Sequence, residues 1–363
     1  MEMRKKFDEI FEDCTKLGTK IKTDEYHSNG KHPIIDQGQE MVAGFTDLED
    51  GLLDAVPAIV FGDHTRIIKY VDCPFFLGAD GVKVLRSKVP NANYRYLYYA
   101  LKNAKIPNTG YNRHYKWLKE LKIEYPPIDQ QVKTVKVLDK VESIIYNRQN
   151  QLQKLDELVK ARFVEMFGGI HDSSLYPYVP VKELTHVISG GTPSRDVLEY
   201  WCDGTIPWVK TTELQNKIIT EVDEHITSKG LAASSAKIVP PNTTLIAMYG
   251  QGKTRGMTGY LGISASTNQA CACILPSPEI NSVYIWKYFE LSYDKLRNMA
   301  KGGNQPNLNG NMIKNFPVLV PPIKRQEEYV QFVNQVDKSK VAVQKSLDEA
   351  QLLFDSLMQH YFG

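Results

Sequence analysis

Two segments of the chain match each other without a gap at a separation of 195 positions. The first runs from Pro126 to Gly168 and the second from Pro321 to Gly363. Identical residues recur along the whole match: Pro126/Pro321, Ile128/Ile323, Gln131/Gln326, Val141/Val336, Gln149/Gln344, Leu152/Leu347, Leu158/Leu353 and Phe167/Phe362. Because both ends stay in register, the chain is predicted to contain one structural unit twice.

Each matching segment is predicted to form one long helix. Neither contains Gly or Pro between its Pro-Pro start and its final Gly, which allows about 38 helical residues, or ~57 Å. Apolar residues follow at steps of three and four: Leu138, Val141, Ile145, Leu152, Leu155, Val159, Phe163 and Met166, and then Val333, Val336, Leu347, Ala350, Leu353 and Leu357. One such helix is typical of any coiled coil, but two with matching seams are expected to pack together.

Two glutamines interrupt these seams at equivalent positions, Gln149 and Gln344. Since two equivalent units in one chain tend to be related by a two-fold axis, we expect the helices to run antiparallel, which brings the glutamines together. A buried polar pair in a coiled coil sets the register at some cost in stability. We therefore predict Gln149 and Gln344 to be this register pair.

The repeat divides the chain into head 1 (residues 1–125), a first spacer helix (126–168), head 2 (169–320) and a second spacer helix (321–363). Similar strings occur in the same order in both heads: AIVFG, VKVLR, YRYLYYALKNA and LKIEY, then TLIAMYG, ACACIL, VYIWKYFELS and FPVLV. The predicted fold class is α/β, with two similar heads joined by two long antiparallel coiled-coil helices in a pseudo-two-fold arrangement. The copies have 168 and 195 residues, so the difference of 27 falls in the heads and suggests two different ligands.

Composition narrows the possible classes. A net charge of +2 neither requires nor excludes a nucleic-acid partner, so local clustering has to decide. No apolar run of 18 residues occurs and no apolar stretch follows the basic start, so we expect a cytoplasmic protein with no membrane contact. The five cysteines include no Cys-x-x-Cys pair, so neither a disulfide framework nor a metal site is expected.

Basic and aromatic residues gather before the first spacer helix. Between Arg95 and Lys122 there are seven basic residues and one acid, Glu120, a local net charge of +6. Basic groups neutralise phosphates, while Asn, Arg and aromatic groups on a loop can read base edges. A solvated helix face accounts equally well for lysines such as Lys102 and Lys119. The predicted DNA-binding residues of head 1 are therefore those of one loop: Tyr111, Asn112, Arg113, His114 and Lys116.

Head 2 has two loops of comparable composition, YGQGKTRG and MAKGGNQPNLNGNMIKN. Amides can make paired contacts to adenine, and Arg and Lys to guanine. Ordinary polar turns rich in Asn and Gly would have the same composition. The predicted DNA-binding residues of head 2 are Gln251, Lys253, Thr254, Arg255, Lys301, Asn304, Gln305, Asn307 and Asn309.

No set of residues predicts a catalytic site. The string from Ala247 to Thr254 meets the loosest form of a phosphate-binding loop, but the working motif needs its Lys and Thr to open a helix. Three glycines follow within eight residues, so no helix is expected there. His64 beside Asp63 could suggest a base, yet an incidental pair at a strand end explains it better.

With these features the whole chain resembles the specificity subunit of Type I restriction-modification enzymes. The resemblance rests on FPVLVPPIKRQEEY and its counterpart IEYPPIDQQVK, on GTPSR and IPWVKTTEL between Gly191 and Leu214, on SSAKIVPPNTTLIAMYG, and on STNQA at Ser266 to Ala270. The order of head, spacer, head, spacer covers essentially all 363 residues. Head 1 lacks the GTPS and NQA strings, so loop roles do not transfer simply between the heads.

The resemblance implies a non-catalytic subunit that binds double-stranded DNA at a bipartite site. Each head would be a target-recognition domain for one half-site, and the helices would dock two methyltransferase subunits, joined by restriction and translocase subunits. S-adenosylmethionine would bind to the methyltransferase partner, and this chain would need no cofactor. Two alternatives remain open: the recognition part of a single-chain restriction enzyme or nucleotide hydrolase, and a coiled-coil scaffold whose heads bind no DNA.

Overall fold

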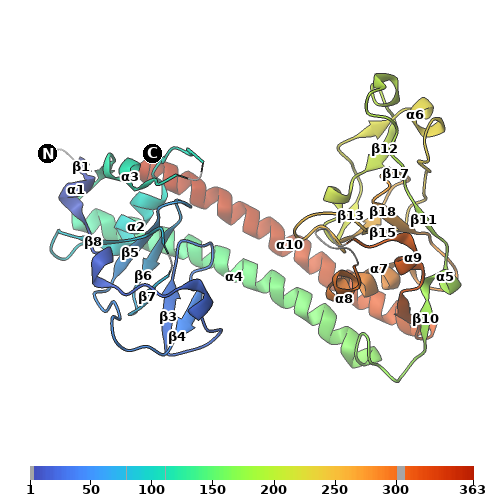
Figure 1. Ribbon diagram of the computed structural model, residues 1–363, viewed down its shortest axis with the longest axis horizontal. Helices are drawn as coiled ribbons and strands as arrows, with labels where there is room; N and C mark the ends of the chain where they lie inside the picture. Colours follow the sequence, from blue (N-terminus) through green and yellow to red (C-terminus); the bar gives the residue numbers. More distant parts are fainter. Residues whose placement is uncertain (1–3, 79, 111, 301–306) are drawn as a thin grey trace. The chain divides into compact units, whose positions relative to one another are not determined.

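The computed structural model describes residues 4–78, 80–110, 112–300 and 307–363 (Figure 1). Residue contacts divide the chain into two compact units. Unit 1 comprises Met1–Asn150 and Gln344–Gly363, and unit 2 comprises Gln151–Val343. Each unit therefore holds one head together with a stretch of each long helix, so the compact units do not coincide with the segments of the sequence repeat.

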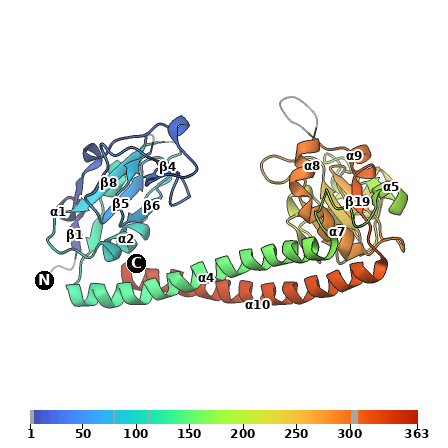
Figure 2. The same ribbon diagram turned by 90° about the horizontal axis from the view of Figure 1, so that it is seen from below.

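The two spacer segments form the long helices α4 (Ile128–Phe167) and α10 (Ile323–Phe362), each of 40 residues (Figure 2). Both start directly after a Pro-Pro pair, because proline is tolerated where the first N–H groups of a helix have no partner. Gly168 ends α4 with a φ of 79° and donates its N–H to the Val164 carbonyl at 2.8 Å. A glycine in this left-handed conformation is a common helix stop.

The helices run in opposite directions within each unit. In unit 1, Arg148 Nε donates to Ser346 Oγ at 3.2 Å, and one groove brings Glu142 of α4 beside Phe354 of α10. In unit 2, Lys340 Nζ lies 2.6 Å from Asp156 Oδ1, and the guanidinium of Arg162 lies over the Phe332 ring. In both units the partner number on α10 falls as the residue number on α4 rises, which confirms the antiparallel prediction.

Two details of the predicted seam are wrong. Gln149 and Gln344 are both exposed, and the Gln344 amide donates to Asp348 on its own helix at 2.8 Å, so they form no buried register pair. Leu353 is 50% exposed, and its neighbour Phe354, 6% exposed, fills the seam. Burial along the helices therefore does not follow the predicted spacing at these positions.

Head 1 contains two main sheets and a short strand pair. In β2-β8-β5-β6 every pair is antiparallel, whereas β4-β3-β7 has one antiparallel and one parallel pair; β1 pairs with β9. The elements are β1 (Arg4–Lys6), α1 (Phe7–Ile10), β2 (Phe11–Asp13), β3 (His32–Ile35), β4 (Gly44–Thr46), β5 (Ala58–Gly62), β6 (Ile68–Val71), β7 (Phe76–Leu77), β8 (Val82–Ser87), α2 (Tyr94–Lys102), α3 (Tyr115–Lys119) and β9 (Lys122–Glu124), with 3-10 turns at Thr15–Leu17 and Thr23–Glu25.

Head 2 has the corresponding sheets β11-β18-β15-β16-β13 and β14-β12-β17 and the pair β10-β19. Its elements are β10 (Tyr178–Pro180), α5 (Val181–Leu184), β11 (Val187–Ser189), β12 (Ile206–Val209), β13 (Lys217–Ile219), β14 (His225–Ile226), α6 (Ser228–Ala232), β15 (Thr244–Ala247), β16 (Thr258–Leu261), β17 (Ser266–Thr267), β18 (Cys271–Ile274), α7 (Ser282–Leu291), α8 (Tyr293–Met299), α9 (Gly310–Lys314) and β19 (Pro317–Leu319), with 3-10 turns at Leu198–Tyr200 and Thr211–Glu213.

The two heads share one topology, which confirms the predicted α/β duplication. Strands β2, β8, β5 and β6 stand in the same order as β11, β18, β15 and β16. Head 2 adds β13, which pairs parallel with β16 and uses part of the longer head 2 sequence.

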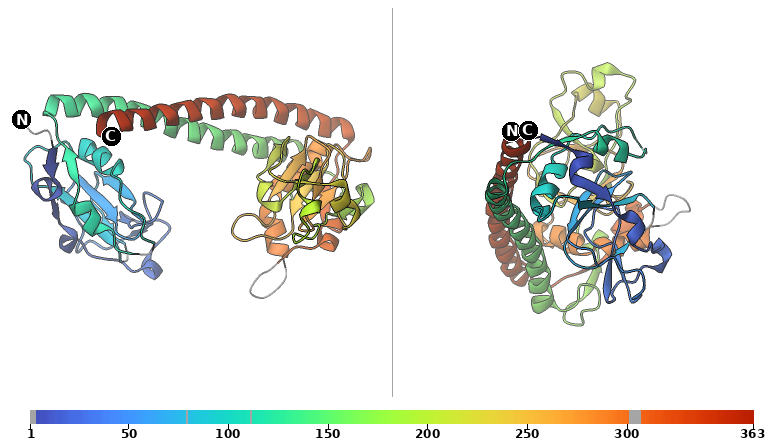
Figure 3. Two further views of the ribbon diagram at one scale, coloured as in Figure 1. Left: turned by 90° about the horizontal axis from the view of Figure 1, so that it is seen from above. Right: turned by 90° about the vertical axis from the view of Figure 1, so that its left-hand side faces the viewer.

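Each head buries its core against both spacer helices. The core of head 1 joins Phe61 and Leu97 to Leu138 of α4 and Phe354 of α10. The core of head 2 joins Tyr284 to Phe163 of α4 and to Tyr329 of α10. In unit 1, Arg4 of β1 and Gly363, which follows α10, line one cavity. Figure 3 shows the C-terminus at the end of α10, beside head 1. Since apolar burial is the main stabilising term, the spacer helices are part of each folded unit.

Candidate nucleic-acid interface

In head 1 a loop of residues 103–114 leads from α2 to α3, and His114 anchors its far end. The His114 backbone N–H donates to the Asp63 carbonyl at 2.8 Å, and the side chain is 0% exposed. The Asp63 carboxylate accepts the backbone N–H of Tyr115 at 2.7 Å. Because Asp63 directly follows the inner strand β5, the loop is fixed to the end of the main sheet.

The predicted DNA-binding residues on either side of this anchor lie on the surface. Asn112 and Arg113 are exposed just before His114, and Lys116 is exposed on the first turn of α3. The turn between β5 and β6 lies beside them, since Asp63 belongs to it, and it exposes Thr65. Tyr111 lies outside the described residues. The structure therefore brings Asn112, Arg113 and Lys116 to one edge of head 1.

The prediction that His114 contacts DNA is wrong. Its Nδ1 lies 2.9 Å from the Asp63 carbonyl oxygen and its Nε2 lies 3.3 Å from Thr109 Oγ1. A ring with no exposed surface and both nitrogens occupied cannot reach a base edge. The sequence did not reveal this because histidine suits a polar anchor as well as a ligand contact.

Two of the basic residues near this loop belong to the joint between head 1 and α4. Arg95 Nη2 lies 2.5 Å from Asp139 Oδ1 and 2.9 Å from Glu142 Oε2, and Lys102 Nζ lies 3.0 Å from Glu142 Oε1. The local charge of +6 therefore overstates what DNA can meet. The remaining cations of the stretch are Lys105, Arg113, Lys116, Lys119 and Lys122.

The ion pairs of this joint also shift an ionisation. Burial alone raises the pKa of the Glu142 carboxyl, but the charge and hydrogen bonds of Lys102 and the hydrogen bonds of Tyr99 and Arg95 outweigh it. The pKa of Glu142 therefore lies below its ordinary value of 4.5. The carboxylate stays charged at neutral pH and keeps α2 attached to α4.

In head 2 the loop between β15 and β16 occupies the place of the β5–β6 turn. Helix α8 holds it from one side: Arg297 Nη1 donates to the carbonyls of Gly252 at 2.9 Å and Arg255 at 3.0 Å, and the Tyr293 hydroxyl donates to the Lys253 carbonyl at 2.7 Å. Among the predicted DNA-binding residues of this loop, Gln251 and Lys253 are exposed. Thr254 and Arg255 are half-buried.

The conformation of this loop does not fit a phosphate-binding motif. Lys253 and Thr254 lie in a turn between the antiparallel strands β15 and β16, and strand β16, not a helix, begins at Thr258. A helix N-terminus that would face a phosphate is therefore missing from this described segment, as the glycine content predicted.

The second predicted loop of head 2 leads into α9. Leu308 is 1% exposed and donates its backbone N–H to the Met248 carbonyl at 3.0 Å, just as His114 donates to Asp63 in head 1. Asn309 caps α9, because its side chain accepts the Met312 N–H at 3.0 Å, and this structural role explains it without DNA. Asn307 is half-buried, and Lys301, Asn304 and Gln305 lie outside the described residues.

Sequence reasoning missed a charged and aromatic cluster in head 2. The Arg195 guanidinium lies 3.7 Å from the Trp201 ring centroid and 5.0 Å from that of Trp208, and Arg195 pairs with Glu224 at 2.6 Å. Lys210 also pairs with Glu224, at 3.0 Å. The strings GTPSR and IPWVK contain Arg195, Trp208 and Lys210, but no periodicity links Arg195 to an acid 29 positions later.

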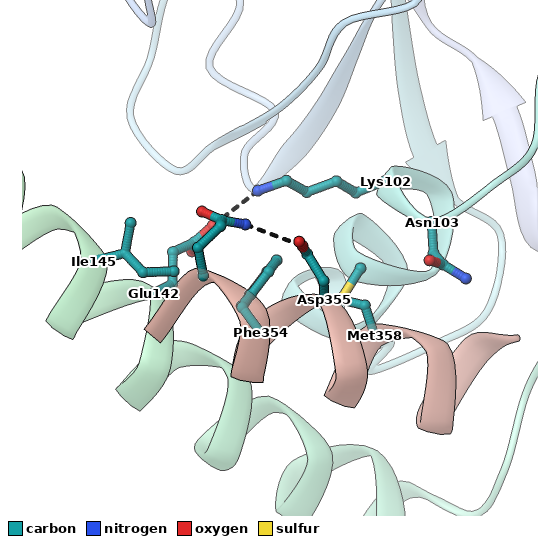
Figure 4. A pocket seen from close by; sticks show the side chains of 8 residues that line it. Lys102, Asn103, Glu142, Ile145, Phe354, Asp355 and Met358 are labelled. Atoms are coloured by element: carbon teal, nitrogen blue, oxygen red, sulfur yellow. Dashed lines mark hydrogen bonds and ion pairs between the residues drawn. The ribbon is translucent and has the colours of Figure 1, made fainter. Parts of the chain in front are cut away.

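Equivalent grooves lie where each head meets the spacer helices. In unit 1 a groove of about 430 Å³ is lined by Lys102, Glu142, Phe354 and Asp355 (Figure 4). In unit 2 a groove of about 890 Å³ is lined by residues at the matching places of the repeat: Asp337 matches Glu142, Val159 matches Phe354, and Lys160 matches Asp355. The duplication thus gives each unit a groove at the matching place of the repeat, with a different size and different side chains.

The helices also expose apolar side chains at matching positions of the repeat. Ile128 and Ile323 are 53% and 40% exposed, Tyr146 and Val341 are 63% and 71% exposed, and Leu158 and Leu353 are 46% and 50% exposed. Scattered exposed apolar residues are ordinary, but these recur at the constant offset of the repeat, so both units carry them at equivalent places.

Within the described ranges, none of the helices is both long and apolar enough to cross a membrane. Among the same residues, no three His, Cys, Asp or Glu side chains are grouped so as to hold a metal ion.

Comparison with solved structures gives the same architecture. The chain is similar to the Type I restriction-modification S subunit from M. genitalium, with a TM-score of 0.59 and 16% identity over 98% of this chain and 94% of that one. It is also similar to a chain from a structure of complex assembly and conformational transition in the type I restriction-modification system, with a TM-score of 0.53 and 16% identity over 96% and 92%. At these identities the likeness concerns the fold.

Sequence comparison identifies the family. The chain is 22% identical to the Escherichia coli Type I restriction enzyme EcoR124I/EcoR124II specificity subunit, over 87% of this chain and 82% of that protein. It is 27% identical to the Methanocaldococcus jannaschii Type I restriction enzyme MjaIX specificity subunit, over 43% and 37%. The Type I restriction modification DNA specificity domain matches twice, at residues 3–157 and 175–350. The chain therefore belongs to the Type I restriction-modification specificity subunits, with two DNA specificity domains.

Proposed function

We propose that head 1 and head 2 each read one half of a bipartite DNA sequence and that the chain supplies no catalytic group. One observation carries the proposal. In both heads a strand-connecting turn and an anchored loop lie together at the end of one inner strand, β5 or β15, through the bonds His114 to Asp63 and Leu308 to Met248. The scaffold is the same and the surface side chains differ, as reading two unlike half-sites requires.

The exposed side chains suit base recognition. Arg113 can make a paired contact to guanine, and Asn112 to adenine, while Lys116 and Lys119 can neutralise phosphates without sequence preference. In head 2 the amide of Gln251 and the ammonium group of Lys253 offer the same two kinds of contact. Base contacts give specificity and phosphate contacts give affinity, so the two classes are separable by mutation.

The spacer helices are proposed to dock two methyltransferase subunits. The matching exposed residues of α4 and α10 and the matching grooves support this, because two copies of one partner need two equivalent surfaces. S-adenosylmethionine would bind to that partner, which would transfer the methyl group to adenine, and restriction and translocase subunits would join the assembly.

A selection experiment tests the proposal. The full-length chain, assembled with the methyltransferase subunit of its own system, is used to enrich a randomised double-stranded DNA library. A split consensus is expected, and Arg113→Ala should relax preference in one half-site only. Lys119→Ala, the matched control on the same head, should weaken binding evenly across sequences. Equal relaxation of both half-sites by Arg113→Ala would contradict the assignment of one head to each half.

The hydrolase alternative has its own test. The chain purified alone should not turn over ATP, because the segment after Lys253 forms a strand where a helix would be needed. Turnover that Lys253→Ala abolishes would overturn the proposal.

A further inference from the structure

His114 connects two parts of head 1 that the sequence separates. Its backbone N–H and its Nδ1 both face the Asp63 carbonyl oxygen, at 2.8 and 2.9 Å. On the other side of the ring, Nε2 lies 3.3 Å from Thr109 Oγ1 and 3.5 Å from the Thr109 backbone nitrogen. The ring thus spans the gap between the end of β5 and the loop that precedes α3.

These partners occupy both ring nitrogens. A carbonyl oxygen only accepts hydrogen bonds, so Nδ1 has to carry the proton that faces Asp63. Nε2 faces the backbone N–H and the hydroxyl of Thr109.

Thr109 in turn shapes the exposed loop. The Asn112 side-chain amide donates to the Thr109 carbonyl, and the Asn112 backbone N–H donates to the Gly110 carbonyl at 2.9 Å. Gly110 has a φ of 77°, which glycine adopts without strain. Arg113 leads from this turn directly into the buried His114. The loop therefore closes on itself, and the His114 ring joins it to the sheet.

Head 2 shows that burial at this place does not require a histidine. Leu308 makes the equivalent backbone bond, to Met248, and is equally buried, but a leucine side chain forms no hydrogen bond to the preceding loop. In head 1 His114 is also the N-cap residue of α3, whereas in head 2 the N-cap residue of α9 is Asn309, which follows Leu308. Packing alone is thus satisfied by leucine, and the hydrogen bonds of the ring nitrogens are a feature of head 1.

We propose that His114 is a positioning residue for DNA recognition by head 1. Its ring holds Thr109 so that Asn112 and Arg113 keep one orientation before DNA arrives. Side chains held in advance lose less freedom on binding and discriminate better between bases. The inference rests on the proposed function, because it concerns how head 1 reads its half-site.

Three variants separate the hydrogen bonds from the packing. His114→Leu copies the head 2 residue and keeps an apolar anchor, His114→Asn keeps a donor near Nδ1 only, and His114→Gln places an amide where Nε2 lies. Each full-length variant is assembled with the methyltransferase subunit and used in the library selection. Thermal unfolding of each variant monitors the fold, and preference at the other half-site serves as the internal control.

His114→Leu and His114→Asn should unfold at nearly the wild-type temperature but lose about 5- to 100-fold of the preference at the half-site that Arg113→Ala relaxes, a typical cost of one mismatched base pair. His114→Gln should retain it, and affinity for non-specific DNA should stay unchanged. Full preference in His114→Leu, equal losses in His114→Gln and His114→Leu, or loss at both half-sites would overturn the inference. If the wild-type chain selects no split sequence, the proposed function fails and the inference falls with it.

Discussion

Gln131 and Gln326 occupy the same position in the two repeats but make different bonds. The Gln326 amide donates to the Pro321 carbonyl at 2.7 Å, and its oxygen accepts the Asn281 N–H at 2.9 Å, which ties the start of α10 to the cap of α7. Gln131 donates to the Pro126 carbonyl at 2.8 Å, but its buried oxygen meets no donor among the described residues. The glutamine is therefore present in both repeats, but within the described residues only Gln326 accepts a hydrogen bond from its head.

This difference predicts unequal effects of one substitution. Gln326→Leu leaves the Asn281 N–H and the Pro321 carbonyl without partners and should cost about 1–3 kcal/mol. Gln131→Leu, the matched control, also removes a buried acceptor that had no partner and should cost less than about 1 kcal/mol. Native-state hydrogen exchange of the full chain can measure both, at α7 for Gln326→Leu and at the start of α4 for Gln131→Leu. Equal protection losses in the two variants would contradict this account.

At the residue scale the sequence could predict chemistry but not position. Asn112, Arg113 and Lys116 lie on the surface as a DNA-binding role requires, whereas His114 is buried and Asn309 caps a helix. Histidine and asparagine serve binding and local structure equally well, and only tertiary contacts decide between the two. The DNA contacts of the exposed residues remain a prediction.

At the level of elements, ion pairs between α2 and α4 attach head 1 to the first spacer helix. Its carboxylate Glu142 has a pKa below its ordinary value of 4.5, so folding favours the charged form. A group with a lowered folded-state pKa contributes stability that is present above its unfolded pKa. That contribution should disappear as the pH falls below about 4.5 and through the folded-state pKa.

Glu142→Gln should therefore destabilise unit 1 at pH 7 by about 1–2 kcal/mol, since it weakens the pairs to Arg95 and Lys102. The difference from wild type should shrink as the pH falls below about 4.5. Glu349→Gln, which removes only a 4.0 Å surface pair to Lys345, should have almost no effect at either pH. Thermal unfolding from pH 7 to pH 3.5 measures both, and a pH-independent loss in Glu142→Gln would argue against the charge-based explanation.

The proposed docking surface makes a prediction that uses the repeat as its own control. Leu353 and its counterpart Leu158 are both exposed and apolar, whereas the counterpart of exposed Leu352 is Glu157. A partner that binds both copies therefore meets an acid at the place of Leu352 in one copy. At the place of Leu353 it meets leucine in both copies. Leu353→Glu should weaken methyltransferase binding at least about tenfold, while Leu352→Glu should leave it unchanged. Equal binding by the two variants in calorimetric titration would reject this surface.

The extent of the long helices could be predicted from the sequence, but the residues that they bury could not. The absence of Gly and Pro fixed the extent of α4 and α10 to within a few residues, because those residues interrupt helices regardless of context. Which apolar residues are buried depends on tertiary packing. Phe354 joins the core of head 1, whereas its neighbour Leu353 is exposed, and Gln149 and Gln344 are exposed as well.

For the whole molecule, duplication explains both the likeness and the difference of the two units. One topology recurs with equivalent strand orders, yet head 2 adds β13 and a long β15–β16 loop where head 1 has a short turn. The repeat was visible in the sequence because the spacer segments align without a gap. The likeness of the heads is topological, since sheets tolerate extensive change at their surface turns.

The most direct test of the proposal that each head recognises one half-site is methylation-sensitive sequencing of the genome of cells that carry this system. The account predicts methylated adenines in one split motif, with two specific half-sites separated by unspecified bases, and their disappearance when this chain is deleted. Arg113→Ala should broaden one half of the motif and leave the other intact. A contiguous motif, or a split motif that survives deletion of the chain, would contradict the account.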